Sequence, residues 1–288
     1  RSVLWGVPND QPYVKDAFHR YIIKGEQSAI NPAEEGTKAA IWTTFYLAAG
    51  KTATLDLVLS AETNDTPFAN HEITLSSKRE EEKAITDSLL PESSQEDKEI
   101  FSKAMAGMVW SQQFYNYDVG RWLDGDDMPP PSSRHSGRNR YWRHLKSEHV
   151  ISMPDTWEYP WFAAWDLAYQ SIVFALFDIE LAKEQISVLL SENMLNPNGQ
   201  IPAYEWSFSD TNPPVHAMGA LEVFRAERQQ KGTGDIDFLQ RVFHKLLLTY
   251  SWWINRKDSK GLNVFEGGFL GLDNISVFDR SQKLPSGY

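Results

Sequence analysis

Aromatic rings stand beside a carboxylate in one stretch of ten residues, 157–166, which reads Trp-Glu-Tyr-Pro-Trp-Phe-Ala-Ala-Trp-Asp. Proline is poorly tolerated inside a helix, so we expect a helix to begin just after Pro160 and to hold Asp166 in its first turns, where the helix dipole keeps the acid ionised. Beside Trp161 and Trp165, such an acid can accept hydrogen bonds from two sugar hydroxyls while the rings pack on the C–H face of the sugar. The alternative is an ordinary acid at a helix start next to core aromatics.

A second polar and aromatic segment follows the Asn-Pro-Asn turn at residues 196–198. Its candidate ligand-binding residues are Gln200, Tyr204, Glu205, Trp206 and Asn212. Because proline restricts the backbone, a loop with several prolines can hold polar groups toward a ligand at little ordering cost. The structural alternative is that Asp210 or Asn212 caps the helix expected near Val215.

A third segment, residues 266–274, reads Glu-Gly-Gly-Phe-Leu-Gly-Leu-Asp-Asn. Glycine accepts positive φ and lets a backbone approach a ligand closely. Asp273 on such a loop can act as a general acid if its surroundings raise its pKa. The alternative is a turn in which the Asp caps a helix.

Composition excludes several other functions. The 39 acidic and 28 basic residues give a net charge of -11, which argues against nucleic acid or an anionic membrane as partner. There is no Cys, no metal-type spacing among the seven His, and no phosphate-binding, dinucleotide or G-x-S-x-G motif, so we expect no metal or cofactor and a structural role for His216 and His244. The 11 Trp, 11 Tyr and 15 Phe fit either an aromatic core or a carbohydrate cleft.

The elements that must position these residues change character along the chain. Residues 1–75 are predicted as β, with strands near 21–23, 39–46 and 52–59, as in the last part of an antiparallel sandwich. Residues 76–120 are predicted as linker helices, one of them at 100–114, and 124–141 as a long loop. Helices are then expected at about 162–179, 181–194, 215–231 and 235–256, with Phe162, Trp165, Tyr169 and Ile172 on one helix face. Without a fixed repeat period, a toroid is favoured over a solenoid.

Taken together, these segments resemble glycoside hydrolase family 63, and most closely its group related to mannosylglycerate hydrolase. The resemblance extends from about Ala104 onward and includes residues 137–145, Gly-Arg-Asn-Arg-Tyr-Trp-Arg-His-Leu, and residues 153–157, Met-Pro-Asp-Thr-Trp. Residues 4–10, Leu-Trp-Gly-Val-Pro-Asn-Asp, are similar to the β-sandwich that precedes the helical domain in such enzymes.

The resemblance implies a mainly α fold: an (α/α)6 toroid over residues 121–288, incomplete here, preceded by the end of an antiparallel β-sandwich. It implies hydrolysis of an α-glycosidic bond with inversion, with Asp273 as proton donor. Trp165 and Asp166 would bind the sugar, and Tyr204, Glu205, Trp206 and Asn212 would line the same pocket, to which we add Trp161 and Gln200. Asp166 as the acid is the alternative. The general base implied by the family is a Glu far downstream, which we expect outside this chain.

Our first hypothesis is therefore an inverting α-glycosidase of the α-glucosidase or α-mannosidase type, with a carbohydrate substrate. The alternatives are a carbohydrate-binding toroid without catalysis and a helical scaffold that binds a peptide. The arginines at 134, 138, 140 and 143 can attract an anionic aglycone or can simply pair with nearby acids. No signal peptide is visible, a weak argument for the cytoplasm, and the start at Arg1 without Met looks truncated. Sequence does not indicate which sugar is bound or the oligomeric state.

Overall fold

The computed structural model describes residues 2, 6–9, 11–125, 129–255 and 262, and the chain divides into two compact units, residues 1–71 and 72–288. The Gly-rich segment with Asp273 lies outside the described residues, so its role stays a prediction. None of the helices that the structure describes is both long enough and apolar enough to span a membrane.

The first unit contains the helix α2, Ala17–Lys24, and the short 3-10 helix η1, Gln27–Ala29. The prediction of a strand at 21–23 is wrong, because these residues belong to α2. Its apolar residues recur with helical spacing, and Gly25 ends it with a left-handed φ of 66°. Residues 39–46 and 52–59 are not assigned as strands either. An apolar alternation becomes a strand only where a partner completes the hydrogen-bond ladder, and these segments have none among the described residues.

The second unit begins with α3, His71–Leu89, whose first residue is the last of the first unit, and continues with α4, Gln95–Trp110. Ser94 caps α4 by accepting a hydrogen bond from the backbone N–H of Asp97 at 3.2 Å. The helix predicted to reach residue 114 stops at Trp110, and the strand β1, Gln112–Asp118, follows. Next come α5, Val119–Asp124, the 3-10 helices η2, Ser132–Ser136, and η3, Arg140–Trp142, and the strand β2, Lys146–Ser152. The two strands pair antiparallel, with Gln112 opposite Ser152.

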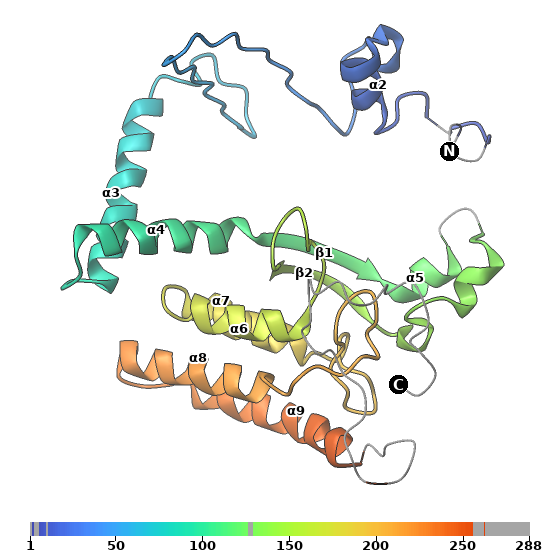
Figure 1. Ribbon diagram of the computed structural model, residues 1–288, viewed down its shortest axis with the longest axis vertical. Helices are drawn as coiled ribbons and strands as arrows, with labels where there is room; N and C mark the ends of the chain where they lie inside the picture. The colour runs from blue at the N-terminus through green and yellow to red at the C-terminus, as the bar shows by residue number, and fades with distance from the viewer. Residues whose placement is uncertain (1, 3–5, 10, 126–128, 256–261, 263–288) are drawn as a thin grey trace. The chain divides into compact units, whose positions relative to one another are not determined.

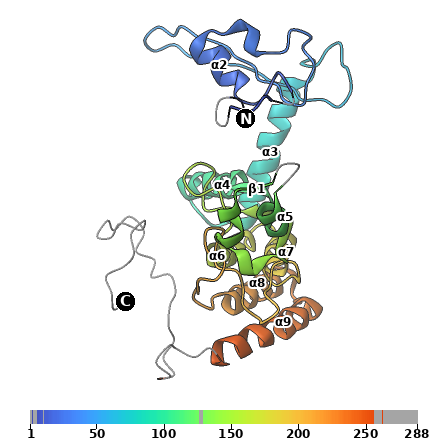
Figure 2. The ribbon, with the colours of Figure 1, turned by 90° about the vertical axis from the view of Figure 1, so that its right-hand side faces the viewer.

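Four helices follow the sheet: α6, Ala164–Phe174; α7, Ile179–Leu189; α8, His216–Lys231; and α9, Ile236–Asn255. Each coincides with a predicted helix, and α6 and α7 are shorter than expected. In Figures 1 and 2, α6 and α7 lie between the sheet and the α8–α9 pair. The second unit is thus mainly helical with one small sheet, consistent with an α-helical glycosidase domain.

The core of this unit shows which face of α6 is buried. Ala164, Leu167, Ala168, Ser171 and Phe174 are all buried, and burial of each large apolar side chain contributes about 1.5–3 kcal/mol. The predicted common face of aromatic residues is wrong in part, because Phe162 precedes the helix and is fully buried. Trp165 and Tyr169 do lie together, with ring centroids 5.9 Å apart, and Tyr169 is 43% exposed. This pair therefore lies off the core-facing side of the helix.

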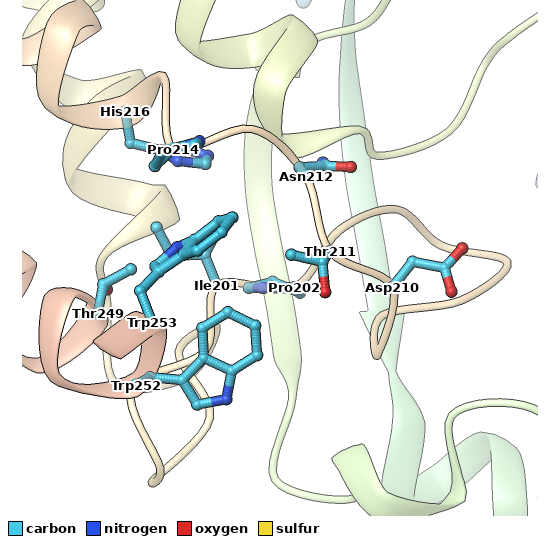
Figure 3. Close-up of a pocket in the computed structure, with 10 residues that line it drawn as sticks. All are labelled: Ile201, Pro202, Asp210, Thr211, Asn212, Pro214, His216, Thr249, Trp252 and Trp253. Carbon is cyan, nitrogen blue, oxygen red and sulfur yellow. The ribbon is translucent and has the colours of Figure 1, made fainter. Parts of the chain in front are cut away.

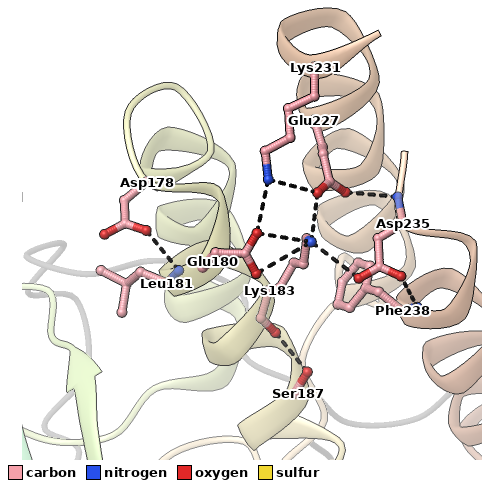
Figure 4. Close-up of polar contacts among 9 residues, drawn as sticks. All are labelled: Asp178, Glu180, Leu181, Lys183, Ser187, Glu227, Lys231, Asp235 and Phe238. Atoms are coloured by element: carbon pink, nitrogen blue, oxygen red, sulfur yellow. Dashed lines mark hydrogen bonds and ion pairs between the residues drawn. The ribbon is translucent and has the colours of Figure 1, made fainter. Parts of the chain in front are cut away.

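Charged residues join α7, α8 and the start of α9 (Figure 4). The Lys183 ammonium of α7 lies 2.7 Å from a carboxylate oxygen of Glu227 on α8 and 3.2 Å from Asp235, which precedes α9. Lys231 lies 3.1 Å from the same Glu227 carboxylate and 3.0 Å from Glu180. Burial alone would raise the pKa of Glu227, but the two lysines and the Asp235 N–H outweigh it and lower that pKa. The network fixes the relative positions of α7, α8 and the start of α9.

Candidate functional site

Backbone hydrogen bonds join two of the segments that the sequence indicates as functional. The Ala164 N–H donates to the Ala203 carbonyl at 2.9 Å, and the Glu205 N–H donates to the Phe162 carbonyl at 3.0 Å. Between them, Ala163 and Tyr204 form an antiparallel bridge. The start of α6, with Trp161 on one side of the bridge, is thus held against the residues around Glu205.

Asn139 joins a third segment, the loop before β2, to the same place. Its side-chain amide donates to the Glu205 carbonyl, and its Oδ1 accepts from the Phe208 N–H at 3.0 Å. Asn139 is 8% exposed and has a left-handed φ of 61°, a conformation that Asn tolerates better than most residues. A few residues later, the Trp142 indole N–H donates to the Ser209 hydroxyl at 2.9 Å. The arginine-containing loop is therefore anchored to residues 205–209.

This anchoring places the Arg138 guanidinium against Trp206. The guanidinium carbon lies 3.8 Å from the centroid of the Trp206 ring, within the range of a strong cation–π contact. The rings of Trp161 and Trp206 are nearly perpendicular with their centroids 5.6 Å apart, and the Tyr159 ring centroid lies 4.5 Å from that of Trp161. Trp206 nonetheless keeps 48% of its surface exposed. The site thus offers a partly open indole surface beside a fixed positive charge.

The Glu205 carboxylate is the acidic group at this site. Burial raises its pKa above the ordinary value for Glu, while the nearby Tyr115 hydroxyl and the Arg138 guanidinium act in the opposite direction. The closest charged contact is 3.8 Å, between a carboxylate oxygen and an Arg138 nitrogen. Burial also raises the pKa of Tyr115, and the charge of Glu205 adds to that effect. Glu205 therefore has one cationic and one hydroxyl neighbour, and these two do not use all the hydrogen-bonding positions of its carboxylate.

Several buried polar atoms near Glu205 make no protein hydrogen bond of normal geometry. They are the hydroxyls of Tyr115 and Tyr117, Nε of Arg138 and the indole nitrogen of Trp161. Buried polar groups are normally paired, so such a group of donors indicates a ligand or solvent that pairs with them. Of these four residues, the sequence indicates Trp161 as a binding residue and Arg138 only as one of four arginines that can attract an anionic aglycone. The alternation Phe114-Tyr115-Asn116-Tyr117 is the signal that could have revealed the two tyrosines, because it places both on one face of a strand.

The other residues predicted to bind the sugar lie at the start of α6 or in the 200–212 loop. Trp165 and Asp166 lie in the first turn of α6, both of them partly buried. The Gln200 side-chain amide is used internally and donates to the carbonyls of Ser209 and Asp210 at 3.1 and 3.2 Å. The Asn212 amide donates to the Ala203 carbonyl at 3.1 Å.

The alternative that Asp210 or Asn212 caps the next helix is wrong. The N-cap of α8 is Val215, and no side chain caps it. The amides of Gln200 and Asn212 instead hold the 200–212 loop in shape. Their role in ligand binding, like that of Trp165 and Asp166, stays a prediction.

Gly199 determines where this loop meets α9. Its φ is +93°, and a Cβ at this position would lie 2.4 Å from the Leu248 carbonyl oxygen. Only glycine allows the turn to approach the α9 backbone this closely.

Within the part of the chain that the structure describes, no group of three or more His, Asp or Glu residues is placed to hold a metal ion.

Comparison with known proteins shows which family part of this chain resembles. Residues 159–283 match the family described as the mannosylglycerate hydrolase MGH1-like glycoside hydrolase domain, a range that includes α6 to α9 and residues 199–212. The chain is 43% identical over 295 residues to the uncharacterized protein YMR196W of Saccharomyces cerevisiae, an alignment that covers 97% of this chain. The chain spans 27% of the length of that relative. The family match supports a glycoside hydrolase-like domain over residues 159–283.

Proposed function

We propose that this chain provides the sugar-binding face of an inverting α-glycoside hydrolase, of the α-glucosidase or α-mannosidase type, that acts on a small glycoside or an oligosaccharide. The observation that supports this most strongly is the group of buried N–H and O–H donors around Glu205 and Trp206 that make no hydrogen bond of normal geometry within the protein. The glycoside hydrolase-like match over residues 159–283 gives these donors a chemical class of ligand.

A sugar ring meets the needs of this group of residues. Its hydroxyls can donate to the Glu205 carboxylate and accept from the Trp161 indole N–H and the Arg138 Nε. Its C–H face can pack on the exposed part of Trp206, because aromatic rings present a flat apolar surface. The charge of Arg138 is compatible with hydroxyl recognition, since hydrogen bonds that involve a charged partner are shorter and stronger than neutral ones.

In this proposal, Trp165 and Asp166 extend the same surface along the first turn of α6, with Tyr204 and Asn212 at its edge. The Asp166 carboxylate then accepts hydrogen bonds from two further sugar hydroxyls. Gln200 contributes by holding the backbone of Ser209 and Asp210 in place. In an alternative role, the Glu205 carboxylate positions the general acid.

The chemical step is hydrolysis in one displacement. Asp273, as general acid, donates its proton to the glycosidic oxygen as the bond from that oxygen to the anomeric carbon breaks. A water molecule attacks the anomeric carbon from the opposite face and loses its proton to a general base. Inverting enzymes place these two carboxyl groups about 6.5–9.5 Å apart, with the water between the base and the sugar. We propose that the base is a Glu outside these 288 residues, and Asp166 remains the alternative acid.

The experiment follows the anomeric configuration of the product by proton NMR, with α-glucosides and α-mannosides as substrates and the full-length polypeptide that carries these residues. We expect β-configured sugar as the first product, and we expect Asp273→Asn to abolish turnover while substrate binding persists. Asp166→Asn is the matched variant and should weaken binding. Turnover that survives Asp273→Asn would refute the acid assignment, and saturable binding without any turnover would favour a carbohydrate-binding toroid that lacks catalysis.

A further inference from the structure

A small cavity lies between the 201–214 loop, the first residue of α8 and the last turns of α9 (Figure 3). Its volume is about 20 Å³. Trp252 and Trp253 project from α9 toward the loop and form one wall, and Thr211 lies on the loop side. A cavity needs about 10–15 Å³ to hold one water molecule, so this one is large enough for a water and too small for a sugar.

Three of the residues that line the cavity carry a buried polar atom with no hydrogen-bond partner in the protein. They are Oγ1 of Thr211, Nε2 of His216 and Oγ1 of Thr249, on side chains of residues that are only 5%, 4% and 6% exposed. They come from three different elements: the loop, the start of α8 and the end of α9. A buried hydroxyl or imidazole nitrogen without a partner destabilises the fold, so three such atoms around one cavity indicate a shared partner.

The tautomer of His216 follows from its other hydrogen bond. The ring pairs with the backbone of Ala164, and because Nε2 is unpaired this bond is made by Nδ1. The Ala164 N–H is already donated to Ala203, so the Ala164 carbonyl is the acceptor and Nδ1 carries the proton. In a neutral imidazole, Nε2 is then an acceptor. The cavity therefore combines one fixed acceptor with two hydroxyls that can each donate or accept.

We propose that the cavity is a binding site for one ordered water molecule, held by Thr211 Oγ1, His216 Nε2 and Thr249 Oγ1. The water donates one hydrogen bond to His216, donates a second to one threonine hydroxyl and accepts a third from the other. Three hydrogen bonds is the usual number for a buried water. The water links α8, α9 and the 201–214 loop through polar contacts that the side chains do not make with one another.

The site also acts at a distance on α6. A water fixed on Nε2 holds the imidazole ring in the orientation in which Nδ1–H reaches Ala164, the residue before Trp165 and Asp166. His216 is thus a positioning residue for the start of α6.

The direct test is a crystal structure of the full chain at about 1.5 Å resolution or better. We expect one solvent peak at hydrogen-bond distance, roughly 2.6–3.2 Å, from all three atoms. A map with no peak in the cavity, or with a peak that contacts fewer than two of the three atoms, would overturn the proposal.

Thermal unfolding of isosteric variants gives an independent test that does not need crystals. Thr249→Val removes one partner of the water, and we expect Tm to fall by about 2–4 °C, with a similar fall for Thr211→Val. The matched control is Thr86→Val, because Thr86 is 4% exposed and its hydroxyl also has no partner, but it does not line the cavity. Its Tm should stay constant or rise. If Thr249→Val and Thr211→Val behave like Thr86→Val, the cavity is dry and the proposal is wrong.

Discussion

Replacing Asn139 with alanine is expected to lower the free energy of unfolding by about 3–5 kcal/mol. The Phe208 N–H is buried and would lose its acceptor, at a cost of about 1–3 kcal/mol, and the partly buried Glu205 carbonyl would lose a donor at about 1 kcal/mol. The left-handed φ of 61° adds about 1 kcal/mol for alanine. Since most domains are stable by only about 5–15 kcal/mol, this loss is large enough to measure and can approach complete unfolding.

Two further variants separate these contributions. Asn139→Gly loses both hydrogen bonds but accepts the left-handed backbone, so we expect it to be about 0.5–1 kcal/mol more stable than Asn139→Ala. Asn139→Asp keeps an acceptor for the Phe208 N–H but places a buried carboxylate oxygen against the Glu205 carbonyl oxygen, so at neutral pH it should lose at least as much stability as Asn139→Ala.

The assay is urea unfolding at equilibrium, followed by tryptophan fluorescence and by far-UV circular dichroism. We expect the midpoint to shift while the dependence of the free energy on urea stays constant, because the surface exposed on unfolding is unchanged. A loss below about 1 kcal/mol for Asn139→Ala would refute the conclusion that this side chain anchors the arginine loop.

Three further predictions test other parts of the structure. Burial lowers the pKa of His216 from 6.5 to about 4, so between these pH values the unfolded chain binds more protons than the folded chain. The free energy of unfolding should therefore fall by about 3 kcal/mol as the pH drops from 7 to 4. His216→Gln should remove this part of the pH dependence in urea titrations, and an unchanged dependence would contradict the prediction. Lys183→Met leaves the buried Glu227 carboxylate with fewer partners and should lower the free energy of unfolding by about 3 kcal/mol. The double variant Lys183→Met with Glu227→Leu should regain most of this stability. A loss under about 1 kcal/mol for Lys183→Met alone would argue against the network. Gly199→Ala should lower the free energy of unfolding by more than about 2 kcal/mol, because it adds a clash with α9 to the strain of a positive φ. Gly232→Ala, at φ +78° with open space around it, should lower it by only about 1 kcal/mol. Equal losses would show that the contact with α9 is unimportant.

Local pattern was enough to predict the four helices after residue 160, because each has a long apolar periodicity and ends near Gly, Pro or Asn. It failed at residues 112–118, where a short strand follows a helix directly. That strand exists because it pairs with residues 146–152, and such a pairing between distant segments leaves little trace in local sequence. In residues 1–71, alternating apolar residues suggested strands, but alternation does not supply a partner strand.

The candidate site shows the same limit. Trp161, Glu205 and Trp206 were selected because aromatic rings next to carboxylates are a visible local pattern. Their proximity depends on the bridge between Ala163 and Tyr204 and on the side chain of Asn139, and sequence spacing does not reveal either. The internal use of the Gln200 amide was likewise hidden, since a buried amide reads the same in sequence whether it binds a ligand or a backbone.

The residues around Glu205 and Trp206 are proposed to bind a sugar ring. Titration of the full chain with methyl α-glucoside and methyl α-mannoside, followed by calorimetry or by ligand-observed NMR, tests this proposal directly. We predict saturable binding that Glu205→Gln and Trp206→Ala each weaken by about tenfold or more, which corresponds to about 1.4 kcal/mol. Trp110→Ala, at an 81% exposed tryptophan of α4, should leave binding unchanged. Binding that neither site variant weakens, or no saturable response to either sugar, would contradict the claim.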